Sequence, residues 1–159
     1  MFGFFKKKKV EAQLALEPSS YPGTNSPVDL AINTNSQSPH YGYVYVIGSV
    51  SNTLSIFDPQ HTLIDTIETG TRPVSIAYHQ ANRNLYILNL SDHTISVLNG
   101  DTHLLTTNIN TPEKNPYTLS ICEKQGDIYV GYLQHSKLSV FGENHSLKEH
   151  FAPPMDKAQ

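Results

Sequence analysis

The stretch YVIGSVSNTLSIFD at residues 45–58 is the part of the sequence that decides the fold. It returns in altered form as YILNLSDHTISVLN at residues 86–99 and as YVGYLQHSKLSVFG at residues 129–142. The first tyrosines of the three copies lie 41 and then 43 residues apart. A fixed period of this length is the mark of a repeat architecture, in which each copy folds as one supersecondary unit.

Each copy is predicted to contain four short strands. Leu54 and Ile56 stand on either side of Ser55, and this period of two is that of a strand and not of a helix. The pairs Asn52–Thr53 and Asp92–His93 are predicted as hairpin turns, because Asn and Asp tolerate positive φ. A proline opens the first strand, where no ladder donor is needed, at Pro27, Pro73 and Pro116. The fourth strands hold the pairs Leu63 with Ile67, Leu105 with Ile109, and Leu147 with Phe151.

Four strands in every 41–46 residues are typical of a β-propeller blade. The sequence therefore predicts an all-β chain of the β-propeller type with three four-stranded antiparallel blades. The predicted blades span residues 26–70, 71–111 and 112–151. The remaining segments are predicted as a basic and aromatic tail at 1–9, an extra strand at 10–17, a linker at 18–25 and a C-terminal tail at 152–159.

The repeated residues resemble the YVTN family of β-propeller repeats. That family's consensus runs Tyr-Val-Thr-Asn, a short turn, Asn-Thr-Val-Ser-Val-Ile-Asp, a strand and then Gly-x-x-Pro, and residues 45–58 with DTIETGTRPV at 65–74 are similar to it. The resemblance covers about residues 26–151. The third copy departs from the consensus with Gly131 and Tyr132 in place of Thr-Asn and with Gly142 in place of Asp. The resemblance implies blades, in a family whose members are mostly seven-bladed and often exported, and it implies no particular chemistry.

Composition and charge exclude some classes of protein. The net charge of −3 gives no reason to expect nucleic acid, and the four lysines at residues 6–9 leave the rest of the chain with 7 basic against 14 acidic residues. The single Cys122 excludes an intrachain disulfide, and its apolar neighbours favour a buried small side chain over a reactive thiol. No segment approaches the roughly 18 apolar residues of a membrane span. The N-terminus does not read as a secretory signal, so the cytoplasm is the default expectation.

The number of blades predicts an assembly. Propellers close with about four to eight blades, so three blades leave open sheet edges and faces. Two chains that give six blades are the simplest completion, and blades from a different chain are the alternative. An alternating segment precedes the blades, and we expect it to pair with a neighbouring subunit as a latch; a disordered tail is the alternative. The apolar positions of this segment are Val10, Ala12, Leu14 and Leu16.

The first nine residues suggest a contact with a surface. Phe4 and Phe5 precede Lys6 and Lys7, and aromatic rings followed by cations suit an anionic membrane interface or a partner protein. A solvated tail is the simpler interpretation, because membrane attachment usually needs a second signal.

Four residues are candidate ligand contacts. Asp29 is the one acidic residue predicted in an inner strand, which would line a central channel, although a hydrated structural role is the simpler interpretation. Arg72, Lys114 and Asn115 lie in loops that converge on the axis of a propeller and could bind an anionic or polar ligand. His61, His103 and His145 recur at the same place in each copy, and we interpret them as turn residues. No metal site and no cofactor is predicted, since no ligand spacing is present.

No catalytic motif appears in the sequence. The leading prediction is a non-enzymatic propeller module that binds other copies or a partner chain and presents loops to a protein, glycan or polymer. A ligand-binding or enzymatic propeller, with its site in a channel formed on oligomerisation, is the first alternative. A peripheral membrane module that attaches through residues 1–9 is the second.

Overall fold

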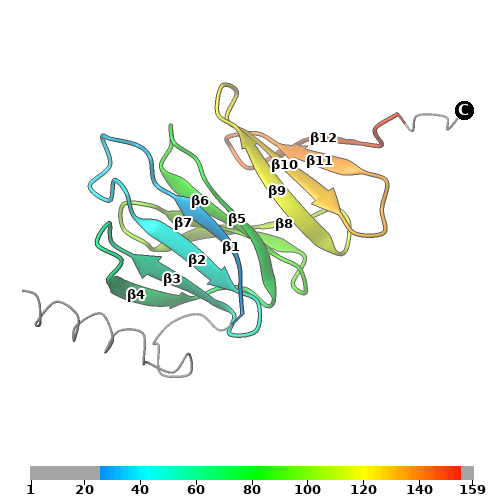
Figure 1. The fold of residues 1–159 in the computed structure, drawn as a ribbon. Coiled ribbons are helices and arrows are strands. Elements are labelled where there is room, and N and C mark those ends of the chain that lie inside the picture. Colours follow the sequence, from blue (N-terminus) through cyan, green and yellow to red (C-terminus); the bar gives the residue numbers. More distant parts are fainter. Residues whose placement is uncertain (1–25, 155–159) are drawn as a thin grey trace, which may run out of the picture.

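The computed structural model describes residues 26–154, which form twelve β-strands (Figure 1). The first blade contains β1 (Pro27–Ile32), β2 (Val44–Gly48), β3 (Thr53–Phe57) and β4 (Leu63–Glu68). The second contains β5 (Pro73–Tyr78), β6 (Asn84–Asn89), β7 (Thr94–Asn99) and β8 (Leu105–Asn110). The third contains β9 (Pro116–Cys122), β10 (Asp127–Tyr132), β11 (Leu138–Phe141) and β12 (Leu147–Phe151). Within these residues there is no helix with the length and apolar character needed to cross a bilayer.

The predicted fold class is confirmed. The strands form three antiparallel sheets, and each sheet keeps its four strands in sequence order. The inner strands β1, β5 and β9 pack side by side, and the second sheet lies between the other two (Figure 1). The predictions made for the segments before residue 26 lie outside the described residues. They concern Phe4, Phe5, Lys6 and Lys7 and also Val10, Ala12, Leu14 and Leu16.

One backbone arrangement recurs at the start of each blade. The residue before each first-strand proline has positive φ, and its carbonyl accepts a hydrogen bond from the main chain just after the second strand. These pairs are Ser26 with Ser49, Arg72 with Leu90, and Asn115 with Leu133. The turns between the second and third strands also contain a positive-φ residue, at Asn52, His93 and Gln134. The predicted turn residues Asn52, Asp92 and His93 lie in these turns, with His93 and not Asp92 in the left-handed conformation, whereas Thr53 is the first residue of β3.

The two blade interfaces are built from matching sets of apolar side chains. In the first blade, one face of the sheet points at the second blade and is fully buried: Tyr45, Ile47, Leu54 and Ile56. The equivalent residues of the second blade point at the third blade and are also fully buried: Tyr86, Leu88, Ile95 and Val97. Each interface is closed from the other side by the next blade, so the core consists of two layers between three sheets.

The outer faces of the end blades carry the same kinds of residue without such cover. Leu30 is 54% exposed, whereas the equivalent Ile76 and Leu119 are 5% and 8% exposed. Ile32 is 46% exposed, whereas the equivalent Tyr78 is 6% exposed. On the third blade, Tyr129 stands at the position of the buried Tyr45 and Tyr86 and is only half-buried. Each of these positions is buried wherever a neighbouring blade covers it.

The inner strands are also tied together by hydrogen bonds. Asp29 accepts bonds at Oδ2 from the Ser75 hydroxyl (3.2 Å) and from the Ile76 amide (3.0 Å). Ser75 in turn accepts a bond at Oγ from the Leu119 amide (3.3 Å). One side chain of β1 and one of β5 therefore reach the backbone of the next inner strand. This contact occupies one oxygen of Asp29, the residue that the sequence suggested as a channel ligand.

Replacement of Asp29 by alanine should lower the free energy of unfolding by about 1–2 kcal/mol, because two bonds to the second blade are lost. Asp65→Ala is a matched control. The carboxylates of Asp29 and Asp65 each accept a bond from the amide of the following residue, and Asp29 has in addition a bond to the next blade. Urea unfolding of the two variants measures the difference. Equal losses in both variants would show that the contact between the blades adds no stability.

Candidate functional site

The connections between blades and the turns between second and third strands lie at one edge of the sheets, called here the loop edge (residues 49–52, 69–72, 90–93, 111–115 and 133–136). Arg72 and Asn115 occupy the same place in successive blades, immediately before the proline. The Arg72 amide donates to Asn52 Oδ1 (2.8 Å), and the Asn115 amide donates to His93 Nδ1 (3.3 Å). The backbone of both residues is therefore fixed, while Arg72 and Lys114, the residue that precedes Asn115, are exposed.

The four candidate ligand residues do not form one site in this chain. Asp29 is on β1, Arg72 is in the loop before β5, and Lys114 and Asn115 are in the loop before β9. None of them lines the three hollows found at the loop edge, which measure about 330, 470 and 300 Å³. Three of the candidates thus lie in two different loops of the loop edge, and Asp29 lies apart from them on the inner strand of the first blade.

The densest polar cluster at the loop edge is centred on Glu113. Its Oε1 accepts a bond from Lys137 Nζ (2.8 Å) and lies 3.1 Å from His150 Nε2, while its Oε2 lies 3.9 Å from His135 Nδ1. The Lys137 bond, helped by His150, lowers the pKa of Glu113 from 4.5 to about 2. Glu113 is therefore a carboxylate at every physiological pH, and it draws the loop before β9 towards β12.

The cluster continues inward as a chain of hydrogen bonds. His150 Nδ1 lies 2.9 Å from Ser139 Oγ, which lies 2.7 Å from the Tyr132 hydroxyl. The order Ser139, His150, Glu113 is that of an acyl-transfer triad. However, Ser139 is 0% exposed and its hydroxyl is shared with Tyr132. A substrate cannot reach this oxygen in the structure.

The second blade shows why Ser139 is buried. Ser96 has the same register on β7, accepts a bond from Asn89 Nδ2 (2.9 Å) and donates to Asn108 Oδ1 (2.8 Å). His150 pairs with Ser139 across the last two strands just as Asn108 pairs with Ser96. The recurring serine thus links the second, third and fourth strands of these blades through side chains, which is a structural role.

Sequence reasoning did not identify Glu113, Lys137 or His150 as a cluster. A usable signal was present, because strand register places His150 at the polar position of the fourth strand that Asn108 occupies in the blade before. Glu113 could not be found in this way, because it lies in a loop whose path is set by tertiary contacts.

The other edge of the sheets, called here the hairpin edge (residues 33–43, 58–62, 79–83, 99–104, 123–126 and 142–146), contains a second recurring contact. The Tyr45 hydroxyl lies 3.3 Å from His103 Nε2 of the next blade, and the Tyr86 hydroxyl lies 3.2 Å from His145 Nε2. The rings meet edge to face, at 5.7 Å and 72° in the first pair and 5.8 Å and 75° in the second. These histidines are turn residues with positive φ, as predicted, and they also join the blades.

Burial sets the protonation of these histidines. Burial lowers the pKa of His103, and His40, stacked on it at 4.5 Å, lowers it further. Burial also lowers the pKa of His145. A neutral imidazole can accept the tyrosine O–H at Nε2, whereas a protonated one cannot, so the contact suits the neutral form.

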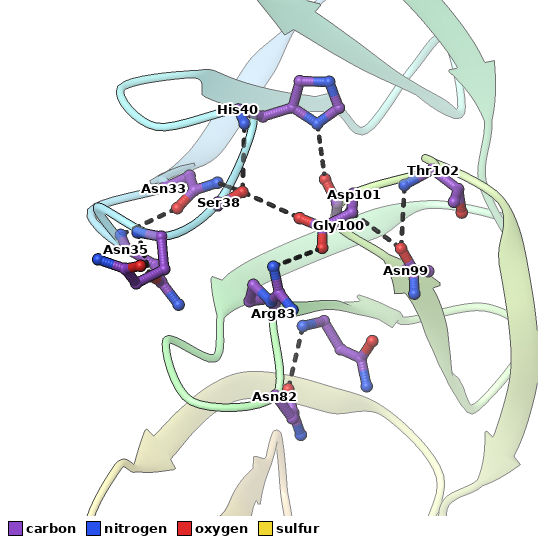
Figure 2. Close-up of polar contacts among 12 residues, drawn as sticks. Asn33, Asn35, Ser38, His40, Asn82, Arg83, Asn99, Gly100, Asp101 and Thr102 are labelled. Carbon is purple, nitrogen blue, oxygen red and sulfur yellow. Dashed lines mark hydrogen bonds and ion pairs between the residues drawn. The ribbon is translucent and has the colours of Figure 1, made fainter.

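A polar network surrounds the first of these contacts (Figure 2). Ser38 receives a bond from Asn33 (2.8 Å) and donates to Asp101 (2.9 Å), which forms an ion pair with Arg83 (2.9 Å). His40 Nδ1 lies 3.1 Å from the Gly100 carbonyl. Asn33 and Ser38 are buried, so this network joins the first two blades and is not a ligand site.

Two further predictions concern reactive and metal-binding groups. Among residues 26–154, no three His, Cys, Asp or Glu side chains are grouped so that they could hold a metal ion. Cys122 was expected to be buried and is partly exposed. The reason is its place at the end of β9, paired with Asp127, on the face that no further blade covers.

Comparison with known proteins supports the fold. No family model matches the chain, and no curated protein matches it. Hydrazine synthase of Kuenenia stuttgartiensis is similar in structure, with a TM-score of 0.71 and 11% identity over 87% of this chain and 40% of its own. Virginiamycin B lyase of Staphylococcus aureus is similar in two structures. The catalytically inactive variant with quinupristin has a TM-score of 0.69 and 13% identity over 86% of this chain, and the selenomethionine-substituted protein has a TM-score of 0.66 and 10% identity over 81%.

These similarities show the propeller-type fold and, at such low identity, nothing of the chemistry. The chain spans only 40–44% of the length of these proteins. It therefore corresponds to less than half of each of the propeller-type chains that it resembles.

The stability of the protein should fall as the pH is lowered below 6.5. The pKa of His103 and of His145 in the folded protein lies below this unfolded value, so their stabilisation is complete above pH 6.5 and is lost as the pH falls through the folded pKa. The double variant His103→Asn/His145→Asn should show a smaller pH slope of the urea midpoint between pH 7.5 and 5. Tyr45→Phe/Tyr86→Phe is the control: it removes the hydroxyls, leaves the histidines buried and should keep the slope.

Glu113→Gln should destabilise the protein at neutral pH and have less effect in acid. The folded pKa of about 2 lies below the unfolded value of 4.5, so the stabilisation is present above pH 4.5 and is lost as the pH falls towards 2. Urea midpoints of the two proteins should therefore approach each other between pH 4.5 and 3. A constant difference over this range would mean that the charge of Glu113 is not responsible.

Proposed function

We propose that the chain is a non-enzymatic part of a β-propeller that assembles with further blades and presents its loop edge for recognition. Its blades are proposed to be YVTN-type repeats. The partner blades come from other copies of the chain or, as the alternative, from a different chain, and the ligand is a protein, glycan or other polymer.

The two uncovered faces of the end blades carry this proposal. They bear side chains that are buried wherever a blade has a neighbour, such as the exposed Leu30 against the buried Ile76. A repeat cannot bury its apolar face without the next repeat, so each end blade has free energy to gain from another blade. The chain covers only 40–44% of the similar solved structures, which is consistent with further blades.

The loop edge supports recognition more than catalysis. Arg72 and Lys114 are exposed on backbone that hydrogen bonds hold in place, which suits binding of an anionic or polar partner. The residues with the most catalytic appearance, Ser139 and His150, are part of a buried link between strands. Two similar structures are of proteins named as a synthase and a lyase, and an enzymatic propeller remains the second candidate for that reason.

Light scattering coupled to size-exclusion chromatography tests the assembly. Between about 1 and 100 µM, the range in which weak protein interfaces dissociate, the purified chain should show a mass of more than one 17.7 kDa subunit at the upper end. A six-bladed particle corresponds to twice this mass. A single-chain mass over the whole range would refute self-assembly and leave completion of the ring to a different chain.

A further inference from the structure

The contacts between successive blades follow one rule at both interfaces. A tyrosine of the second strand meets a histidine of the next blade, as Tyr45 does with His103 and Tyr86 with His145. Each tyrosine is surrounded by an apolar face that is fully buried against the next sheet. The rule has a direction, because at both interfaces the earlier blade gives the tyrosine and the later blade gives the histidine.

The third blade presents the forward half of this contact with no blade described beyond it. Tyr129 is in the position of Tyr45 and Tyr86 and lines a hollow of about 320 Å³ together with Val140. Thr118 has the place of Asp29 and Ser75 on the inner strand, and it is exposed beside a second hollow of about 330 Å³. This face therefore has both the tyrosine and the inner-strand oxygen that bind the following blade at the two interfaces within the chain.

The first blade presents the backward half. His61 occupies the turn position of His103 and His145, with φ of 63° against 59° and 66°, so its side chain leaves the backbone in the same way. It is exposed, whereas the other two are partly buried. Leu30 and Ile32 project from β1 on the side opposite to Ala31, which packs against the second blade.

We infer that a second copy of this chain docks head to tail, with the third blade of one copy against the first blade of the next. In this arrangement Tyr129 meets His61 of the second copy, and Leu30 and Ile32 of that copy cover the hollows beside Tyr129 and Thr118. The inference deepens the proposed function by naming its partner. A second copy is favoured over a different protein for one reason. The open face of the third blade has the tyrosine and the open face of the first blade has the histidine of an interface that the chain already forms twice.

The same rule sets the size of the assembly. Propellers close with about four to eight blades, and six is the one multiple of three in that range. Two copies therefore close a ring through two identical interfaces, which leaves no face uncovered. The alternative for a dimer is pairing of like faces, first blade with first blade or third with third. Like-face pairing would place Tyr129 against another Tyr129 and would leave the tyrosine–histidine rule unused.

Variants that block one face distinguish these arrangements. Leu30→Lys/Ile32→Lys charges the first-blade face, and Tyr129→Lys charges the third-blade face. Under head-to-tail pairing each variant alone should be a single chain, because both interfaces of the ring contain one blocked face. A mixture of the two should recover a particle of two chains, held by the one interface whose faces are both intact. Light scattering on each sample and on the mixture measures this.

Val50→Lys/Leu104→Lys is the matched control. It replaces two exposed apolar side chains, adds the same charge and affects turns at opposite edges, so it should assemble as the unmodified chain does. Circular dichroism should show unchanged strand content in all variants. A single-chain mass for the unmodified protein refutes the proposed self-assembly. If the unmodified protein is a dimer and the single-face variants also remain dimeric, the head-to-tail inference is wrong while self-assembly still holds. The same conclusion follows if the mixture of the two variants stays monomeric.

Two smaller changes keep the inference testable if the lysine variants do not fold. Tyr129→Phe removes only the hydroxyl, and His61→Asn keeps a residue that tolerates the left-handed turn. Each single variant should raise the dimer dissociation constant about fivefold for each lost hydrogen bond. The double variant should raise this constant no more than the single variant with the larger effect, because both changes remove the same bond. Independent, additive effects would show that Tyr129 and His61 do not meet.

Discussion

The whole structure depends on one constraint: each blade has two flat apolar faces, and a face is buried only by another blade. The sheets themselves pair their neighbouring strands by hydrogen bonds without help from another blade. What they cannot do alone is remove Tyr45, Ile47 and their equivalents from water. The second blade is covered on both sides and holds more of the fully buried residues than either of its neighbours, whereas the first and third are covered on one side each.

Polar contacts fix how the faces meet. At the hairpin edge the tyrosine–histidine pairs and the network around Asp101 join neighbouring blades, and at the inner strands Asp29 and Ser75 do the same. At the loop edge the Arg72 amide is bonded to Asn52 while the Arg72 side chain is exposed, and Glu113 is bonded through its side chain to Lys137. Hydrogen bonds thus join the blades at both edges, through side chains at the hairpin edge and through the amides of Arg72 and Asn115 at the loop edge.

Most of the fold was predictable from the sequence, and most of the contacts between blades were not. Repeat spacing, the opening prolines and the alternation around Ser55 are local features, so strands and blades followed from them directly. The turn position of His103 was also local, but its contact with Tyr45 joins residues 58 positions apart and required the blades to be placed. Asp29 was correctly assigned to an inner strand, and its bond to the next blade needed the packing of β1 on β5. Cys122 was expected to be buried because its neighbours in the sequence are apolar. Its exposure depends on the absence of a covering blade on its face within residues 26–154, which the local sequence does not indicate.

The directional tyrosine–histidine contact has a consequence for how such a chain changes over time. Each unit contains both a donor for the blade after it and an acceptor for the blade before it, so duplication of the DNA that encodes one unit copies both halves together. A newly inserted blade would meet compatible surfaces on either side without any compensating substitution. Gain or loss of whole units is therefore an easier route of divergence for this architecture than a point change at the tyrosine or the histidine. Such a point change removes a contact with the neighbouring blade.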